Sequence, residues 1–105
     1  MIFDMRIYTL HPSKLAAWLR LYEQYGHPTQ VKHCGEPVLY ATTEVGHLNQ
    51  VVHIWRYESQ ADRERKRDAL MNDPVFQDYL RMSVELGAHQ NQENRILKST
   101  AFSPI

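Results

Sequence analysis

Two segments far apart in the chain, residues 2–10 and 50–57, alternate between two sets of side chains with the two-residue period of a β-strand. Both are rich in β-branched and aromatic residues, and neither contains glycine or proline. Successive side chains of a strand point to opposite faces of its sheet, so each segment predicts a strand with two different faces. A fold for this chain must therefore place two such strands and supply a partner for each of their faces.

The rest of the pattern predicts two helical regions and two further strands. The first helical region carries an aromatic stripe at three- and four-residue spacing, and the second has a charged part followed by an apolar stripe. In chain order we expect a helix over residues 15–25, capped by Ser13 and interrupted near Pro28, then a strand over 36–45 and a turn at 46–49. After the strand 50–57 we expect a helix capped by Ser59, a second helix from Pro74 to Gly87 capped by Asp73, and a last strand over 94–100.

The resulting order is β, α, β, β, α, β, which is that of the ferredoxin-like arrangement. We therefore predict a single α+β domain over residues 1–105, with a four-stranded antiparallel sheet and helices on one face only. In this topology the segments 2–10 and 50–57 are antiparallel neighbours at the centre of the sheet.

The uncovered face of such a sheet predicts self-association. If Phe3, Met5 and Ile7 face the helices, the alternate residues of the two central strands face outward. The side chains then expected on the outer face are Asp4, Arg6, Tyr8, Leu10, Val51, His53, Trp55 and Tyr57. A contiguous aromatic patch usually marks an interface or a ligand site. Because the formal net charge is zero, two copies of the chain would not repel each other electrostatically. We predict a homodimer whose sheets pack face to face as an α/β barrel around a semi-polar pocket; the alternative is a monomer with scattered aromatic residues.

The same face gathers the residues that could carry chemistry. His53 is a candidate general base, because an imidazole titrates near neutral pH; the alternative is a buried neutral ring bonded to a neighbour. Asp4 is a second candidate base and Arg6 could hold a carboxylate, carbonyl or enolate oxygen of a ligand. The alternative for Asp4 and Arg6 is that they pair with each other.

Aromatic residues would form the walls of a site for a small ligand. The candidates are Tyr8, Tyr40, Trp55 and Tyr57, which could stack on an aromatic substrate or fill the core of the dimer interface. The mixed-charge run 63–68 predicts a solvated helix face with local ion pairs, with phosphate binding as the alternative.

Composition argues against several classes of protein. With 12 basic and 12 acidic residues the chain has no electrostatic reason to bind nucleic acid or an anionic membrane, and it has no apolar segment of the roughly 20 residues that span one. A single cysteine, Cys34, and the absence of a signal-peptide pattern predict a cytosolic location. Six histidines lack the spacings of metal sites, and no nucleotide-binding loop is present, so we expect no metal and no cofactor.

Three stretches resemble the NIPSNAP family of the dimeric α/β-barrel superfamily. The first is the start Asp4-x-Arg6-x-Tyr8-Thr9-Leu10, and the second is the central run from Gly46 through His53-x-Trp55-x-Tyr57 to Ser59. The third consists of the helix residues Arg63, Arg65 to Arg67, Leu70, Asp73-Pro74 and Phe76. Phe76 stands where the family pattern has Trp. The resemblance implies a ferredoxin-like fold and a dimeric barrel. Similar barrels include cofactor-independent monooxygenases acting on aromatic polyketides, haem-binding enzymes, and members without assigned activity.

Three functional hypotheses follow. The first is a dimeric protein of unassigned activity that binds a small aromatic or apolar ligand. The alternative is a cofactor-independent monooxygenase or isomerase for an aromatic or enolisable substrate, with Asp4 or His53 as base and Arg6 holding an enolate-like oxygen. A haem protein with His53 or another histidine as axial ligand is disfavoured, because so small a barrel needs its interior for side chains.

Overall fold

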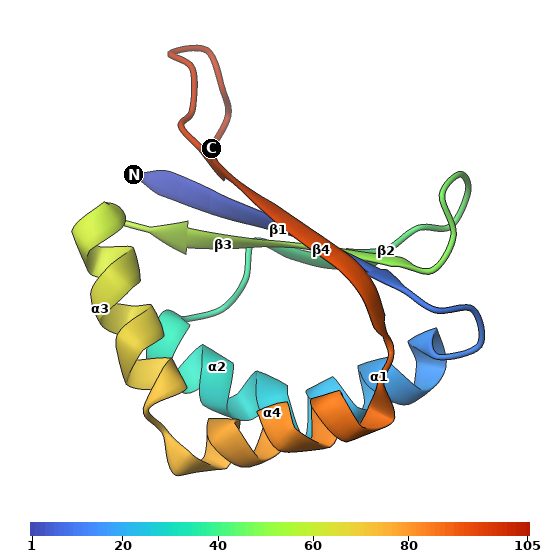
Figure 1. The fold of residues 1–105 in the computed structure, drawn as a ribbon. Helices are drawn as coiled ribbons and strands as arrows, with labels where there is room; N and C mark the ends of the chain where they lie inside the picture. Colours follow the sequence, from blue (N-terminus) through green and yellow to red (C-terminus); the bar gives the residue numbers. More distant parts are fainter.

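A four-stranded antiparallel sheet lies against one layer of helices in the computed structural model, which describes all residues 1–105 (Figure 1). The strands are β1 (Ile2–Leu10), β2 (Leu39–Thr42), β3 (Gln50–Tyr57) and β4 (His89–Leu97), in the spatial order β2-β3-β1-β4. The helices are α1 (Leu15–Leu21), the π-helical turn η1 (Tyr22–Gly26), α2 (His27–Cys34), α3 (Gln60–Met71) and α4 (Pro74–Leu86). The predicted ferredoxin-like α+β fold is confirmed.

The two central strands pair as the sequence predicts. In the antiparallel register of β1 with β3, Asp4 lies opposite Trp55 and Arg6 lies opposite His53. Directly opposite residues share one face of a sheet, so the two candidate triplets form one surface.

That surface faces the helices, and the outward orientation predicted from the sequence is wrong. The ring centroids of Tyr8 in β1 and Trp18 in α1 are 5.9 Å apart. Leu10, Val51, Trp55 and Tyr57 belong to the buried cluster that also holds aromatic residues of η1 and α4. Bulky rings fill the space between two layers better than smaller side chains, and the buried charge of Asp4 finds a partner there on α3.

The opposite face of the sheet is apolar across β2, β3 and β1, is bordered by Arg95 and Glu93 of β4, and is only partly covered. In the strand registers, Leu39, Ile54 and Met5 form one row across β2, β3 and β1, and Ala41, Val52 and Ile7 form the next. We call these six residues the outer face. They are half-buried, except that Leu39 is exposed.

The first helical region continues through its predicted interruption. Instead of a break, the chain makes the π-helical turn η1 and then α2, with Pro28 in the first turn of α2. A Cβ at Gly26 would lie 2.8 Å from the Tyr22 ring and 3.1 Å from the Tyr79 ring, so glycine lets α4 pack closely here. Ser13 is not the helix cap: its φ is +68° and Lys14 occupies the cap position.

Other element boundaries were predicted with mixed success. Ser59 caps α3 by accepting a hydrogen bond from the backbone N–H of Asp62, and Asp73 caps α4 in the same way through Val75, as expected. The strand β2 is shorter than predicted. The strand β4 begins at His89 rather than at Asn94, because it is held by its backbone pairing with β1 and carries mainly exposed polar side chains.

Candidate functional site

A cavity of about 580 Å³ lies between the sheet and the helices. This volume falls in the range of small-molecule sites, about 300–1,000 Å³. Its lining residues come from every layer of the fold: Arg6, Tyr8, Trp18, Tyr22, Gln30, Tyr40, His53, Arg67, Met71, Phe76, Tyr79, Leu80, Ser83, Val84, Gly87, His89 and Gln92. Met71 and Val84 are exposed to solvent, so the cavity reaches the surface on the side of α3 and α4.

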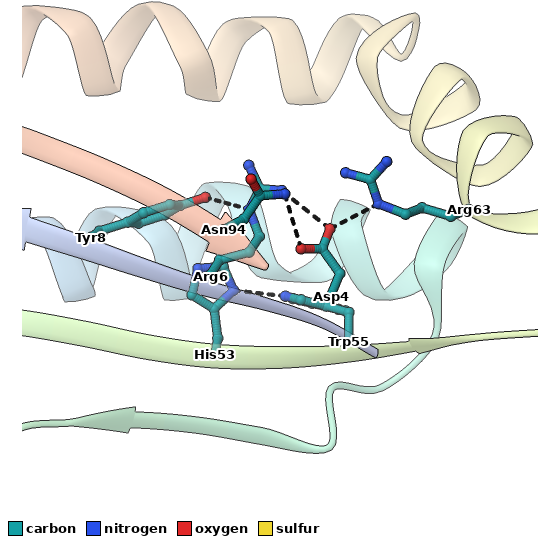
Figure 2. A network of polar contacts seen from close by, with 7 residues as sticks. All are labelled: Asp4, Arg6, Tyr8, His53, Trp55, Arg63 and Asn94. Atoms are coloured by element: carbon teal, nitrogen blue, oxygen red, sulfur yellow. Dashed lines mark hydrogen bonds and ion pairs between the residues drawn. The ribbon is translucent and has the colours of Figure 1, made fainter. Parts of the chain in front are cut away.

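His53 lies on the sheet side of this cavity with 1% of its surface exposed. Its Nδ1 accepts a hydrogen bond of 2.6 Å from the indole Nε1–H of Trp55 (Figure 2). An indole N–H can only donate, so Nδ1 carries no proton and the neutral ring holds its proton on Nε2. Burial lowers the pKa of His53 to about 3, with a further contribution from the nearby guanidinium groups of Arg6 and Arg67. The ring is therefore neutral at pH 7.

The Nε2 atom of His53 has no hydrogen-bond partner in the protein and is buried. The ring around it is held firmly: Tyr40 stacks on it at 4.5 Å between centroids, and Tyr8 meets it edge-on at 4.7 Å. A residue that lines the cavity thus holds a fixed, desolvated N–H donor. A buried donor without an acceptor costs about 1–3 kcal/mol, which an acceptor group on a ligand would recover.

Asp4 anchors a network of ion pairs beside the cavity (Figure 2). Its carboxylate accepts hydrogen bonds from Arg63 Nε at 3.0 Å, Arg6 Nη1 at 3.2 Å and Asn94 Nδ2 at 3.3 Å. Burial alone would raise the pKa of Asp4, but these partners together lower it below its ordinary value. The group is therefore ionised, fully buried and engaged on both oxygens. It holds Arg6 in place, and Arg6 in turn donates from Nε to the hydroxyl of Tyr8 at 3.1 Å.

Aromatic rings of the helices complete the cavity wall. Trp18 and Tyr22 stack with their planes 6° apart and their centroids 5.4 Å apart, and Tyr22 also stacks on Tyr40 at 5.0 Å. Tyr79 of α4 meets Tyr22 edge-on at 5.8 Å. Offset and edge-on ring contacts of this kind are individually worth about 0.5–1.5 kcal/mol beyond their buried area. They make a stiff apolar wall opposite the polar atoms of the sheet.

The charges that line the cavity have one sign. Arg6 and Arg67 are among the lining residues, and no aspartate or glutamate is. The other basic residues of α3 each pair with a carboxylate: Arg63 with Asp4, and Arg65 and Lys66 with Asp62. The pairs of Arg65 and Lys66 with Asp62 are local, as predicted for the run 63–68, whereas the pair of Arg63 with Asp4 joins α3 to β1. Arg67 differs, because its guanidinium makes no ion pair or hydrogen bond and borders the cavity.

Other kinds of site find less support in the structure. No group of three or more His, Cys, Asp or Glu side chains is placed to hold a metal ion. None of the helices combines the length and apolar character needed to cross a membrane.

Comparison with known proteins identifies the family of this chain. Residues 3–104 match the NIPSNAP family over almost the whole chain. The chain belongs to the NIPSNAP family. It is 30% identical over 103 residues to NipSnap of Drosophila melanogaster, which covers 98% of this chain and 36% of the fly protein. It spans about a third of the length of the curated NipSnap relatives that it matches.

Solved structures place this NIPSNAP chain among close structural relatives. A protein from Agrobacterium tumefaciens has 35% sequence identity and a TM-score of 0.93, covering 100% of this chain and 99% of that one. An antibiotic biosynthesis monooxygenase has a TM-score of 0.63 with 13% identity, covering 95% of this chain and 99% of that one. At that identity the likeness concerns the fold alone.

Of the site residues predicted from the sequence of this NIPSNAP domain, Arg6, Tyr8, Tyr40 and His53 line the cavity. The other three lie behind them: Asp4 holds Arg6, Trp55 bonds to His53, and Tyr57 lies in the buried core beside Cys34. The sequence therefore brought the right two strands together but did not separate residues at the surface of the cavity from those that support them.

Several lining residues of the NIPSNAP domain were not predicted. Trp18, Tyr22 and Tyr79 were assigned to helix stripes without a site, and His89 fell outside the predicted last strand. The stripes themselves were the available signal, since an aromatic helix face must cover one face of the sheet. Arg67 carried no signal, because nothing in the sequence separates it from the other basic residues of its run.

Proposed function

We propose that this NIPSNAP domain binds a small organic molecule with an aromatic or apolar body in the cavity between the sheet and the helices. The observation that carries the proposal is His53, a residue of the cavity wall whose buried Nε2–H has no acceptor in the protein. A neutral donor among aromatic rings suits a ligand with an apolar body and at least one acceptor oxygen.

In this proposal each predicted site residue has a defined role. His53 is a hydrogen-bond donor to the ligand rather than a general base, because its Nδ1 is occupied by Trp55 and its pKa of about 3 makes it a weak base. Tyr8 and Tyr40 contact the body of the ligand. Trp55 and Asp4 act as positioning residues, the first through His53 and the second through Arg6.

A substitution that fills the cavity tests the proposal. Ser83 is a small buried residue at the cavity wall, so Ser83→Leu should occupy the space where a ligand would lie. We expect the wild-type protein to bind members of a panel of aromatic acids, amides and quinones in calorimetry, and Ser83→Leu to lose at least about tenfold in affinity, the equivalent of 1.4 kcal/mol.

Ala16→Leu is the matched control, because it adds the same side chain at an exposed position of α1 and should bind as the wild type does. Heteronuclear NMR spectra would show whether both variants keep the fold. The proposal is wrong if no compound in the panel shifts resonances of cavity residues, or if both variants bind equally well.

The geometry favours binding over the predicted oxygenase or isomerase chemistry. Both candidate bases are engaged: Asp4 accepts three hydrogen bonds from cationic and amide groups, and His53 is held neutral with its basic nitrogen occupied. Proton abstraction by either residue would first require one of these contacts to break.

We also propose that two copies of the domain pair through the outer face, in the cytosol. What supports pairing is the two apolar rows that cross three strands, together with the absence of net charge on the chain. The aromatic residues that led to this prediction lie on the other side of the sheet, so the interface proposed now consists of Met5, Ile7, Leu39, Ala41, Val52 and Ile54. A buried free thiol at Cys34 fits a reducing compartment.

A further inference from the structure

We infer that the ligand of the cavity is an aromatic or apolar carboxylic acid, whose carboxylate is bound by Arg6 and Arg67 and accepts a hydrogen bond from His53. This inference rests on the proposed function, since it names the class of molecule that the proposed site takes. It differs from the proposed function in a single property of the ligand, its negative charge.

The first support is the sign of the lining charges. Two arginines line the cavity and no aspartate or glutamate does. Asp4 lies behind Arg6 and compensates it, but it shares its oxygens with Arg63, which does not line the cavity. The one charge of Asp4 cannot balance both Arg6 and Arg63, so the cavity keeps a surplus of at least one positive charge, which suits a carboxylate.

The second support is the isolation of Arg67. The other basic residues of α3 are all paired with carboxylates of this chain, as described above. Arg67 has no carboxylate partner and is half-buried at the cavity wall. A guanidinium presents a planar set of donors that matches a carboxylate. An unpaired, partly desolvated arginine at the wall of a cavity is the arrangement expected when the anion comes from outside the protein.

The third support is that Arg6 and Arg67 line the same cavity as His53. Arg6 lies directly opposite His53 in the register of β1 with β3, so their side chains leave the same face of the sheet. Arg67 reaches the cavity from α3, on the helical side. One group held between them would meet donors from both layers, while its apolar body would lie against Trp18, Tyr22 and Phe76.

Matched pairs of acid and amide separate the charge from the shape of a ligand. The probes are benzoic acid, 3-phenylpropanoic acid and 2-naphthoic acid, each measured by calorimetry at pH 7 against its own primary amide. We expect at least one acid to bind more tightly than its amide by about ten- to hundredfold, which is the range of a charge-assisted hydrogen bond.

Arg67→Met should remove most of this preference by weakening the acid while leaving the amide unchanged. Arg67 is the residue of choice because it has no partner whose loss would disturb the fold, whereas changing Arg6 would leave Asp4 without one of its cations. Arg67→Lys should restore part of the preference. Arg20→Met is the control, since it removes the same charge from an exposed position on α1 outside the cavity and should leave both affinities as they are.

The possible results distinguish a failure of the carboxylic-acid inference from a failure of the proposed binding function. If amides bind as tightly as acids, or if Arg67→Met keeps the preference, the inference fails and the proposed binding function stands. If 2-naphthyl phosphate binds more tightly than 2-naphthoate, the carboxylate is the wrong anion. If none of the acids or amides binds, the proposed function itself fails and the inference with it.

Discussion

His53 shows how one contact sets the chemistry of a residue. An imidazole near neutral pH is open to three roles, as base, acid or simple donor. The indole of Trp55 occupies Nδ1 and leaves the proton on Nε2, and burial keeps the ring uncharged. The spacing of His53 and Trp55 in the sequence places them on one face of a strand, but the 2.6 Å contact that selects the donor role depends on the side-chain conformations in the folded protein.

The lowered pKa of His53 predicts a pH-dependent stability. Between about pH 6.5 and pH 3 the unfolded chain binds a proton at this residue and the folded chain does not. The free energy of unfolding should therefore fall as the pH falls through this window, by up to about 1.4 kcal/mol per pH unit from this group alone. Urea unfolding at pH 7, 6, 5 and 4.5 measures the slope.

His53→Gln is the comparison for this slope, because its amide oxygen can still accept from Trp55 and its side chain does not titrate. Contributions from Asp4, whose lowered pKa also removes stability in acid, are common to both proteins and cancel in the difference. Parallel curves for the two proteins between pH 7 and pH 4.5 would show that His53 titrates normally in the fold.

Among the elements, the π-helical turn η1 determines how closely α4 approaches the first helical region. Tyr22 of this turn contacts aromatic rings on α1, β2 and α4, and Gly26 leaves room for the rings of Tyr22 itself and of Tyr79. The sequence indicated a disturbance at Gly26 and Pro28, but a local pattern cannot distinguish a break from a turn with wider hydrogen bonding.

Gly26→Ala tests the importance of this close packing. In an ordinary helix interior the change from glycine to alanine stabilises by about 0.8–1 kcal/mol. Here the new methyl group would meet Tyr22 at 2.8 Å and Tyr79 at 3.1 Å, so we expect destabilisation of about 1–3 kcal/mol in urea unfolding. A stabilised variant would mean that α4 can move away from η1 without cost.

Elements with strong periodicity were predicted well, and those held by pairing alone were not. β1, β3 and the capped helices α3 and α4 follow from alternation, helical stripes and cap residues. β4 has almost no apolar pattern, and its extent depends on backbone hydrogen bonds to β1 that no local pattern records.

For the molecule as a whole, alternation predicted two sheet faces but not which of them the helices cover. Both faces of β1 and β3 contain large apolar residues, so hydrophobicity did not decide the orientation. The deciding facts are long-range: Arg63 and Asn94 meet Asp4, and the aromatic residues of α1 and α4 need ring partners of similar size. Of the seven candidate site residues, Arg6, Tyr8, Tyr40 and His53 therefore line the cavity, on the sheet face that the helices cover instead of the outer face predicted from the sequence.

The proposed pairing of two chains predicts a specific mass and a way to lower it. Light scattering after gel filtration should give about twice the 12.4 kDa of one chain. Ile54→Glu places a charge at the centre of an outer-face row, between Leu39 and Met5, and should give the mass of one chain. Arg20→Glu, at an exposed position of α1 on the helical side of the sheet, is the control. A wild-type mass of 12.4 kDa at micromolar concentration contradicts the pairing.

The alternation of β1 has a consequence for how the sequence can change. Arg6 borders the cavity, while its neighbours Met5 and Ile7 belong to the outer face. Substitutions can alter either set alone, so affinity for a ligand and affinity for a second chain can diverge independently among relatives. Deleting one residue within the strand would exchange both sets at once, putting a guanidinium on the apolar side and a methionine under the helices. Variation in β1 and β3 should therefore proceed by replacement, with insertions and deletions confined to the loops.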